Sequence, residues 1–259
     1  MKHGLPLFSA LLLLAAVAHA EPPPGYKLAW ADEFDGTQLD AKKWKHWFPG
    51  RRRDAFDVPE AVSVRDGFLT ITTYTENGRH CTGVISTEGL FESRFGYWEA
   101  RIRWADAPGT WSAFWSMPLT IGEPVGDVAK AGAEVDFVEH RAVDPENKNI
   151  ADTANFTLHY DGYGDDHKVK WHATEPLGLG EGFHIYGCEW SEKGYRFFID
   201  GRQLWSIDEP VSKQTQFTIL STEVDDKSWA NRIPKEGYGD RATSRVKFVV
   251  DYVRYYSKP

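Results

Sequence analysis

The stretch AEVDFVEH, residues 133–140, alternates acidic and apolar side chains. Successive side chains of a strand point to opposite faces, so Glu134 and Asp136 share one face while the Val and Phe that follow them point into an apolar layer. A strict period of two would send Glu139 into that apolar layer, where an unpaired carboxylate costs several kcal/mol. We therefore predict a β-bulge at Val138, which turns Glu139 back to the face of the other two acids.

Three carboxylates on one open face repel each other, so at least one pKa must rise while hydrogen bonds hold another down. A retaining glycosidase needs this division between an ionised nucleophile and a protonated acid, with carboxyl groups about 5 to 5.5 Å apart. The spacing alone is weak support, because 38 of 259 residues are acidic and such a pattern arises by chance about once in a chain of this length. The alternative is the polar face of a solvated strand, so the rest of the sequence has to decide.

The first 20 residues have the features of a secretory signal peptide. A Lys near the start is followed by the apolar run 11–17 and then by Ala18-His19-Ala20, a small-x-small cleavage site. The alternative is a membrane anchor, which would need about 20 apolar residues. We predict cleavage near Ala20, a single domain over residues 21–259, and a secreted or periplasmic protein.

Composition limits the class of partner. The formal net charge is −8, or −9 once Lys2 is removed with the signal peptide, and the isoelectric point is about 5.6. An acidic chain argues against nucleic acid or an anionic membrane as partner, whereas a neutral polymer is easily accommodated.

Cys81 and Cys188 are the two cysteines of the chain. In an oxidising compartment they could form a disulfide, and the alternative is two buried thiols on separate strands. The sequence has neither a CxxC pair nor the Cys/His spacing of a zinc site.

Strand signals dominate the remainder, and no segment has a long apolar period of 3.6 residues. The main strand-forming runs are 68–73, 96–104, 133–140, 196–199, 202–205 and 246–256. Asp200-Gly201 between two of these runs is a strong signal for a hairpin turn. Many strands with Gly-rich turns and almost no helix predict an all-β sandwich of two packed antiparallel sheets.

Aromatic residues are numerous, with 11 Trp and 11 Tyr. Tryptophan can stack on the apolar face of a sugar ring while its N–H bonds a hydroxyl, although a single Trp is more often part of a core. Trp111 and Trp115 follow a turn at Pro108-Gly109 and precede the acidic stretch by some twenty residues. We predict that both face a sugar.

The chain resembles glycoside hydrolase family 16, the jelly-roll enzymes that include laminarinases, lichenases, agarases and carrageenases. Matching segments follow in order across most of the chain: WADEFDGTQLDAKKW, RDGFLTI, GYWEARIRW, GTWSAFWSMP, AEVDFVEH, TLHYDG, FHIYGCEW, YRFFIDG and VDYVRYY. EVDFVE is similar to the bulged form of the family signature, as in its laminarinase and algal-galactan branches. The resemblance implies a jelly-roll β-sandwich with a concave substrate cleft.

The resemblance also implies the roles of the three acids. Glu134 would be the nucleophile and Glu139 the general acid and then base, while Asp136 would hydrogen-bond the nucleophile. Trp111 and Trp115 would flank the sugars on the donor side of the scissile bond. His159 in TLHYDG would lie beside the acid/base, and a purely structural histidine is the alternative.

Members of this family often carry a structural calcium ion far from the cleft. The similar positions here are Glu33, Gly67 through its carbonyl, and Asp251, and oxygen ligands of this kind suit calcium. The alternative is that the two acids are ordinary surface residues. We expect no cofactor to be required for catalysis.

Two further features bear on the substrate. Glu223 ends a strand where many laminarinases have glycines, so it would add a polar contact to a sugar hydroxyl if it faces the cleft; otherwise it is a solvent-facing strand end. The run 51–53 is Arg-Arg-Arg beside Trp44 and Trp47. Guanidinium groups bind sulfate in a fork, so this loop could select a sulfated galactan, although an Arg run is more often a solvated loop.

We therefore predict an endo-acting, retaining hydrolase of β-linked polysaccharide, with β-1,3- or mixed-linked glucan as the first substrate class and algal β-galactans as the alternative. A transglycosylase and a non-catalytic glucan-binding protein are further alternatives. The presence of Glu134, Asp136 and Glu139 together favours catalysis over binding alone. We expect a monomer, because a cleft for a long polymer needs no partner subunit.

Overall fold

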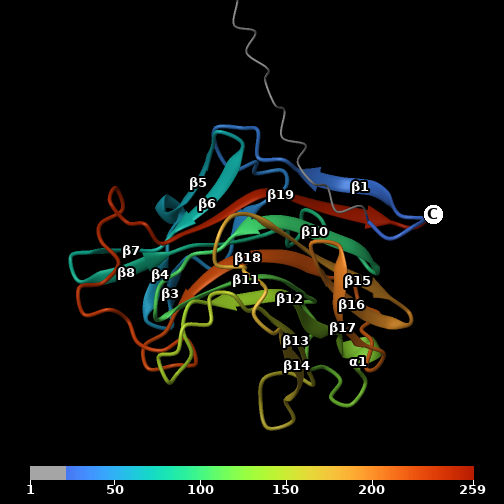
Figure 1. Ribbon diagram of the computed structural model, residues 1–259. Helices are drawn as coiled ribbons and strands as arrows, with labels where there is room; N and C mark the ends of the chain where they lie inside the picture. Colours follow the sequence, from blue (N-terminus) through green and yellow to red (C-terminus); the bar gives the residue numbers. More distant parts are fainter. Residues whose placement is uncertain (1–21) are drawn as a thin grey trace, which may run out of the picture.

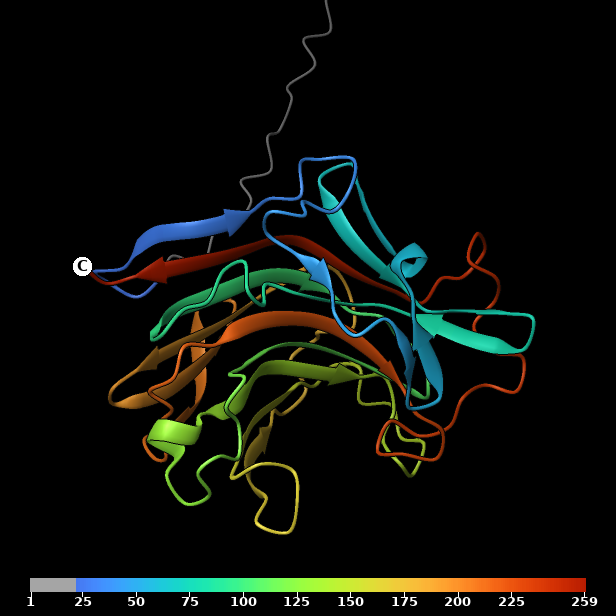
Figure 2. The same ribbon diagram turned by 180° about the vertical axis from the view of Figure 1, so that it is seen from behind.

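Two large antiparallel sheets are stacked face to face and curve in the same direction (Figures 1 and 2). The computed structural model describes residues 22–259, so the predicted signal peptide lies outside the described residues. The sandwich confirms the all-β fold predicted from the strand signals. Each predicted strand run corresponds to an observed strand within one or two residues at the ends.

The outer sheet has eight strands in the order β17-β16-β15-β10-β19-β6-β5, with β1 paired to β19. Its strands are β1 (Lys27–Asp32), β5 (Val62–Arg65), β6 (Phe68–Thr72), β10 (Gly96–Arg103), β15 (His184–Ser191), β16 (Gly194–Ile199), β17 (Arg202–Ile207) and β19 (Lys247–Ser257).

The inner sheet has seven strands in the order β14-β13-β12-β11-β18-β9-β2 and carries the acidic stretch near its centre. Its strands are β2 (Lys45–His46), β9 (Val84–Ser86), β11 (Thr110–Met117), β12 (Ala133–Arg141), β13 (Asn155–Tyr160), β14 (Lys168–Ala173) and β18 (Phe217–Val224).

A third, smaller sheet lies at one end of the sandwich and was not predicted. It consists of β3 (Gly50–Arg52), β4 (Ala55–Asp57), β8 (Arg79–Thr82) and β7 (Tyr74–Glu76), in that order. The pair β4 and β8 is parallel, whereas the other pairs of this small sheet are antiparallel. Helix is confined to α1 (Val128–Ala131) and a 3₁₀ turn, η1 (Pro59–Ala61), within the described residues.

The main hydrophobic core fills the space between the two large sheets. Trp98, Ala100 and Ile102 of β10 all point into it, as the period-two pattern predicts. Removing such apolar area from water is the main stabilising contribution of the sandwich. The predicted hairpin joins β16 to β17 through Asp200 and Gly201, whose φ angles of 48° and 77° fit the left-handed turn that such a short connection requires.

The two cysteines lie on different sheets and do not pair. Cys81 is on β8 of the small sheet and Cys188 is on β15 of the outer sheet, and both are buried free thiols. Burial raises the pKa of Cys188 well above its usual range. The structure therefore agrees with the alternative of two separate buried thiols.

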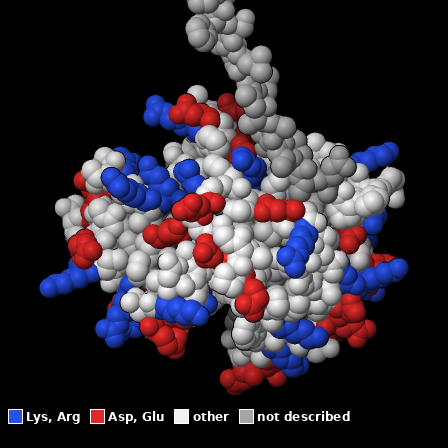
Figure 3. All heavy atoms as spheres, viewed as in Figure 1, with Lys and Arg blue, Asp and Glu red and all other residues white. Residues whose placement is uncertain are grey.

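Charged side chains of both signs are interspersed over the face seen in Figure 3. Between residues 22 and 259, helices are too short and too polar to cross a bilayer.

Candidate active site

The acidic strand β12 contains the predicted bulge. On one side, the adjacent residues Phe114 and Trp115 of β11 pair with Val138 and Asp136, so Phe137 is an extra residue. On the other side, three steps along β12 from Asp136 to Glu139 match only two steps along β13. Phe137 and its neighbour Val138 are both buried in the core. The prediction is confirmed, and the bulge consists of these two residues.

As a result, Glu134, Asp136 and Glu139 all face a cleft of about 990 Å³ on the inner sheet. The cleft crosses the sheet from Trp47, just after β2, to Trp171 on β14. Of the predicted substrate contacts, those that line it are Trp111, Trp115, His159 and Glu223.

Neutral groups surround the carboxylates of β12. The Thr157 hydroxyl donates to Oε2 of Glu139 at 2.8 Å, and the Tyr163 hydroxyl donates to Oε2 of Glu134. The Nε2 atom of His159 lies 3.4 Å from Oδ2 of Asp136 and 3.8 Å from Oε1 of Glu134. The two hydroxyl hydrogen bonds fix the orientation of Glu139 and Glu134 without supplying a positive charge, whereas the buried Oδ2 of Asp136 has no hydrogen-bond partner among residues 22–259.

Burial is the first cause of high carboxyl pKa values in this group. It raises the pKa of Glu134 to about 7, with Glu139 adding to the rise and the Tyr163 hydrogen bond opposing it. It raises the pKa of Glu139 to about 7, opposed by the Thr157 hydrogen bond. Burial also raises the pKa of Asp136 well above its usual range, and both neighbouring acids add to the rise. The three carboxyl groups can therefore hold protons near neutral pH, and they titrate as a coupled group.

His159 is a neutral member of this cluster. Burial and the adjacent His167 lower its pKa to about 4. Its Nδ1 lies 2.9 Å from Nε2 of His167, and the two rings stack with centroids 5.1 Å apart. His159 therefore lies beside Asp136 and Glu134 and connects them to a second histidine on the loop 161–167.

Trp111 and Trp115 both line the cleft but are largely covered, with exposures of 8% and 6%. The Arg53 guanidinium lies over the Trp111 ring at 4.8 Å from its centroid. The indole N–H of Trp115 donates to Oγ of Ser221 at 3.0 Å. Both rings are thus fixed in place, as a preformed platform needs.

Glu223 and the arginine run meet in the cleft. The Nε atom of Arg52 lies 2.5 Å from Oε1 of Glu223, and Nε of Arg53 lies 3.0 Å from Oε2. Glu223 is only 5% exposed, so this pair of arginines compensates its charge. Glu223, predicted as a sugar contact, therefore pairs with the loop 51–53, which was predicted as a sulfate site.

Several residues that line the cleft were not predicted from the sequence, among them Arg141, Tyr163, His167 and Trp229. Arg141 continues the period-two alternation from Glu139, a signal that could have found it, and its guanidinium stacks 3.7 Å from the ring centroid of Trp229. Trp229, Tyr163 and His167 come from irregular loops, whose path over the cleft no local pattern predicts.

The predicted calcium positions lie on the outer sheet or beside it. Arg254 binds both carboxylate oxygens of Glu33 at 2.9 Å, and Arg101 lies 2.5 Å from Oδ2 of Asp251. Both carboxylates are thus already neutralised by arginine, and a calcium ion at Glu33, Gly67 and Asp251 would have to displace those contacts or use backbone carbonyls. The side chains as placed do not fit an ion held by these two carboxylates. Calcium binding at Glu33, Gly67 and Asp251 stays a prediction.

The sequence model of the family described as beta-porphyranase A-D, GH16 domain, matches residues 27–258. A beta-porphyranase B from Phocaeicola plebeius is 28% identical over 91% of this chain and 86% of its own length. A glucan endo-1,3-beta-glucosidase A1 from Niallia circulans is 22% identical over 71% of this chain but only 30% of that relative's length. The chain therefore spans less than a third of the length of this glucanase.

Among solved structures, porphyranase B from Zobellia galactanivorans superimposes with a TM-score of 0.73 at 23% identity, covering 93% of this chain and 98% of that one. At this identity the likeness shows the shared fold.

Proposed function

Since the chain belongs to glycoside hydrolase family 16, and within it to the family of beta-porphyranase A-D domains, we propose that it is an endo-acting, retaining hydrolase of β-linked polysaccharide. The bulge in β12 carries this proposal, because it places Glu134, Asp136 and Glu139 on one face of the cleft. A cleft that crosses the whole sheet also suits an internal segment of a long chain.

In the first step, ionised Glu134 attacks the anomeric carbon while Glu139 gives its proton to the leaving glycosidic oxygen. The raised pKa of Glu139, caused by burial, keeps this proton available near neutral pH. The Tyr163 hydroxyl stabilises the charge on Glu134, since it donates to the carboxylate that must be ionised.

In the second step, Glu139 takes a proton from water, whose oxygen attacks the anomeric carbon and breaks its bond to Glu134. A neutral Asp136 beside Glu134 can donate a hydrogen bond to the released carboxylate. Burial and both neighbouring acids favour this protonation state. In these two steps Glu134 supplies the nucleophile, Glu139 transfers the proton, and Asp136 supplies a hydrogen bond.

Among substrates, we place a sulfated β-galactan first. The matched family is described as beta-porphyranase, and the cleft contains Arg52 and Arg53. Both arginines bind Glu223 through Nε, and among contacts of residues 22–259 Arg52 uses no other nitrogen. Its terminal nitrogens are therefore left to bind a sulfate in a fork. The guanidinium over Trp111 puts a cation next to a platform for a sugar ring.

A β-1,3- or mixed-linked glucan is the second candidate, supported by relatives such as the Niallia circulans glucanase. Neutral glucan chains would stack on Trp111 and Trp115 and leave the arginines as structural partners of Glu223.

The proposal also includes secretion and a monomeric state. N-terminal sequencing of the exported protein would test cleavage near Ala20.

The test is product analysis of the purified mature protein on porphyran, agarose, carrageenan, laminarin and mixed-linked glucan. We expect oligosaccharides with the β configuration retained from at least one polymer, and porphyran first. The Glu134→Ala variant should lose at least about 10⁴-fold in turnover while its fold and polysaccharide binding persist. Turnover unchanged by Glu134→Ala would remove Glu134 as nucleophile, and release from laminarin alone would reverse the order of substrates.

A further inference from the structure

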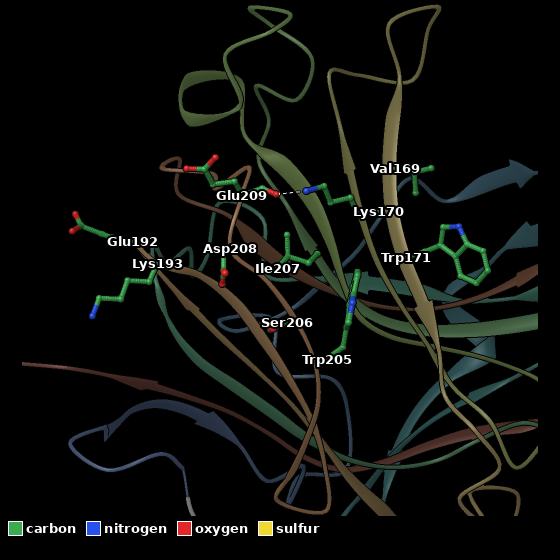
Figure 4. A pocket seen from close by; sticks show the side chains of 10 residues that line it. All are labelled: Val169, Lys170, Trp171, Glu192, Lys193, Trp205, Ser206, Ile207, Asp208 and Glu209. Atoms are coloured by element: carbon green, nitrogen blue, oxygen red, sulfur yellow. Dashed lines mark hydrogen bonds between the residues drawn. The ribbon is translucent and has the colours of Figure 1, made fainter.

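The far wall of the cleft carries an aromatic side chain that no catalytic step uses. Trp171 lies on β14, the edge strand of the inner sheet, and is 65% exposed. Val169, two residues earlier on the same face, is 44% exposed, and both residues line the cleft. Lys170 between them points to the opposite face and donates to the carbonyl oxygen of Glu209 (Figure 4).

The ring of Trp171 is free to receive a ligand. Within residues 22–259 it stacks on no other aromatic ring and lies beneath no cation. Trp111 differs in this respect, since it is 8% exposed and packs against Arg53 and Trp229. A Trp exposed to water gives up the stabilisation that burial would provide. Single apolar residues scattered over a surface need no explanation, but an exposed ring inside a cleft indicates a ligand contact.

Cross-strand pairing puts Trp171 in line with the catalytic acids. Asp136 on β12 is opposite Thr157 on β13, and Thr157 is opposite Trp171 on β14. Directly opposed residues share a face, and neighbouring strands are about 4.8 Å apart, so Trp171 lies roughly 10 Å from the acidic strand. On the other side of β12, Trp115 is opposite Asp136. One row of the sheet thus has a tryptophan on each side of the catalytic centre.

We propose that Trp171 and Val169 form a sugar-binding subsite on the acceptor side of the scissile bond. This inference rests on the proposed hydrolase function and on Trp111 and Trp115 holding the donor sugars, which puts β14 on the leaving side of β12. An indole face and an adjacent apolar side chain match the apolar face of a pyranose ring. The ligand class is a neutral or sulfated β-linked hexose polymer.

Such a subsite acts twice in a retaining mechanism. It first holds the part of the polymer that departs, and it can then hold an incoming chain while the donor is bound to Glu134. In that transfer step, a hydroxyl oxygen of the incoming sugar bonds to the anomeric carbon, the bond to Glu134 breaks, and Glu139 takes the hydroxyl proton. A ring held on Trp171 therefore favours transfer to sugar over transfer to water.

The experiment compares wild type, Trp171→Ala and Leu119→Ala. Leu119 is 72% exposed and lies outside the residues that line the cleft, so its variant controls for loss of an exposed apolar side chain. Porphyran and laminarin serve as substrates, and chromatography separates hydrolysis products from longer transfer products. For Trp171→Ala we expect KM to rise and the transfer-to-hydrolysis ratio to fall, each by about five- to tenfold, with kcat on saturating polymer nearly unchanged.

Mobility in gels containing each polysaccharide separates the two proposals. If wild type cleaves a polymer and Trp171→Ala matches it in KM, transfer ratio and retardation, the subsite is wrong and the hydrolase stands. If wild type cleaves nothing but Trp171→Ala loses the retardation that Leu119→Ala retains, the subsite stands as a binding site and the hydrolase is wrong. Loss of retardation in both variants would also overturn the subsite, because the effect would not be specific to β14.

Discussion

Two sets of buried carboxylates lie in the same cleft, and the protein surrounds them in opposite ways. On β18, Glu223 has two guanidinium groups within 3.0 Å of its oxygens. On β12, hydroxyl groups donate to Glu134 and Glu139, and a neutral histidine lies beside Asp136. Among residues 22–259, these acids form no ion pair with Lys or Arg.

The difference separates a structural acid from acids that can do chemistry. A carboxylate clamped by two arginines fixes the loop 51–53 against the sheet, because both partners must stay together to avoid an unpaired buried charge. Within the described part of the chain, the β12 acids have no cation in direct contact. Burial therefore raises their pKa values although Arg52 and Arg141 act against the rise at Glu134 and Glu139, and they can exchange protons near neutral pH at a cost in stability. The same substitution, Glu to Gln, should therefore have opposite effects on stability in the two sets.

Among the tests of this contrast, the largest effect is expected for Glu139→Gln. Loss of the general acid should lower kcat by about 10²- to 10⁴-fold. The pKa of Glu139 is raised from 4.5 to about 7 in the folded protein, so folding binds a proton that the unfolded chain releases. Wild-type stability therefore falls as pH rises from about 4.5 to 7, and the amide variant escapes this loss. We expect its unfolding free energy to exceed that of wild type by about 1–3 kcal/mol at pH ~8.

Urea unfolding at about pH 4.5 and pH 8 checks this sign. Glu192→Gln is the matched control, since Glu192 is exposed and its replacement should change the unfolding free energy by less than about 0.5 kcal/mol. A Glu139→Gln variant whose stability relative to wild type is the same at both pH values would show that the β12 acids are not destabilising when ionised.

Glu223→Gln should act in the other direction. It leaves the guanidinium groups of Arg52 and Arg53 against a neutral amide, and we expect the unfolding free energy to fall by about 1–3 kcal/mol. The loss is smaller than for a fully buried pair, because the two arginine side chains are 35% and 45% exposed. Arg51→Gln is the control, since Arg51 is exposed and donates only to a backbone carbonyl among its contacts with described residues. Stabilisation by Glu223→Gln would show that Glu223 behaves like the acids of β12 instead.

The same contrast shows which features of the site could be predicted from the sequence alone. The bulge was predictable, because period two and the cost of burying Glu139 concern neighbours within one strand. The arginine run and Glu223 were read as two separate features, because their contact joins residues about 170 positions apart. Such pairing depends on the order of strands in the sheet, which local patterning does not determine. For the same reason the calcium positions could be proposed, but not their pairing with Arg254 and Arg101.

Loops were the other limit. Tyr163 and His167 lie between β13 and β14 in a segment with two glycines, and nothing in its composition predicts that it folds back over the acids. Strand β14 carries Lys and His residues that point away from the cleft, so Val169 and Trp171 do not stand out as an apolar face. Strands and their faces were therefore predictable, whereas the side chains that complete the site became visible only with the tertiary path.

The smallest expected effect, and the finest test of the contrast, concerns Tyr163→Phe. The Tyr163 hydroxyl opposes the rise in the pKa of Glu134, so its loss should raise that pKa above about 7. A hydrogen bond worth about 1 kcal/mol corresponds to a shift of roughly 0.7 pH unit. Because the nucleophile must be ionised, the acid limb of kcat/KM should move to higher pH by this amount. Below the limb the variant should be about fivefold slower, and well above it nearly equal to wild type. Tyr160→Phe, on the neighbouring strand end, should leave the limb in place. A uniform loss of activity with an unmoved limb would mean that Tyr163 acts on the substrate or the fold, and that other neighbours set the charge of Glu134.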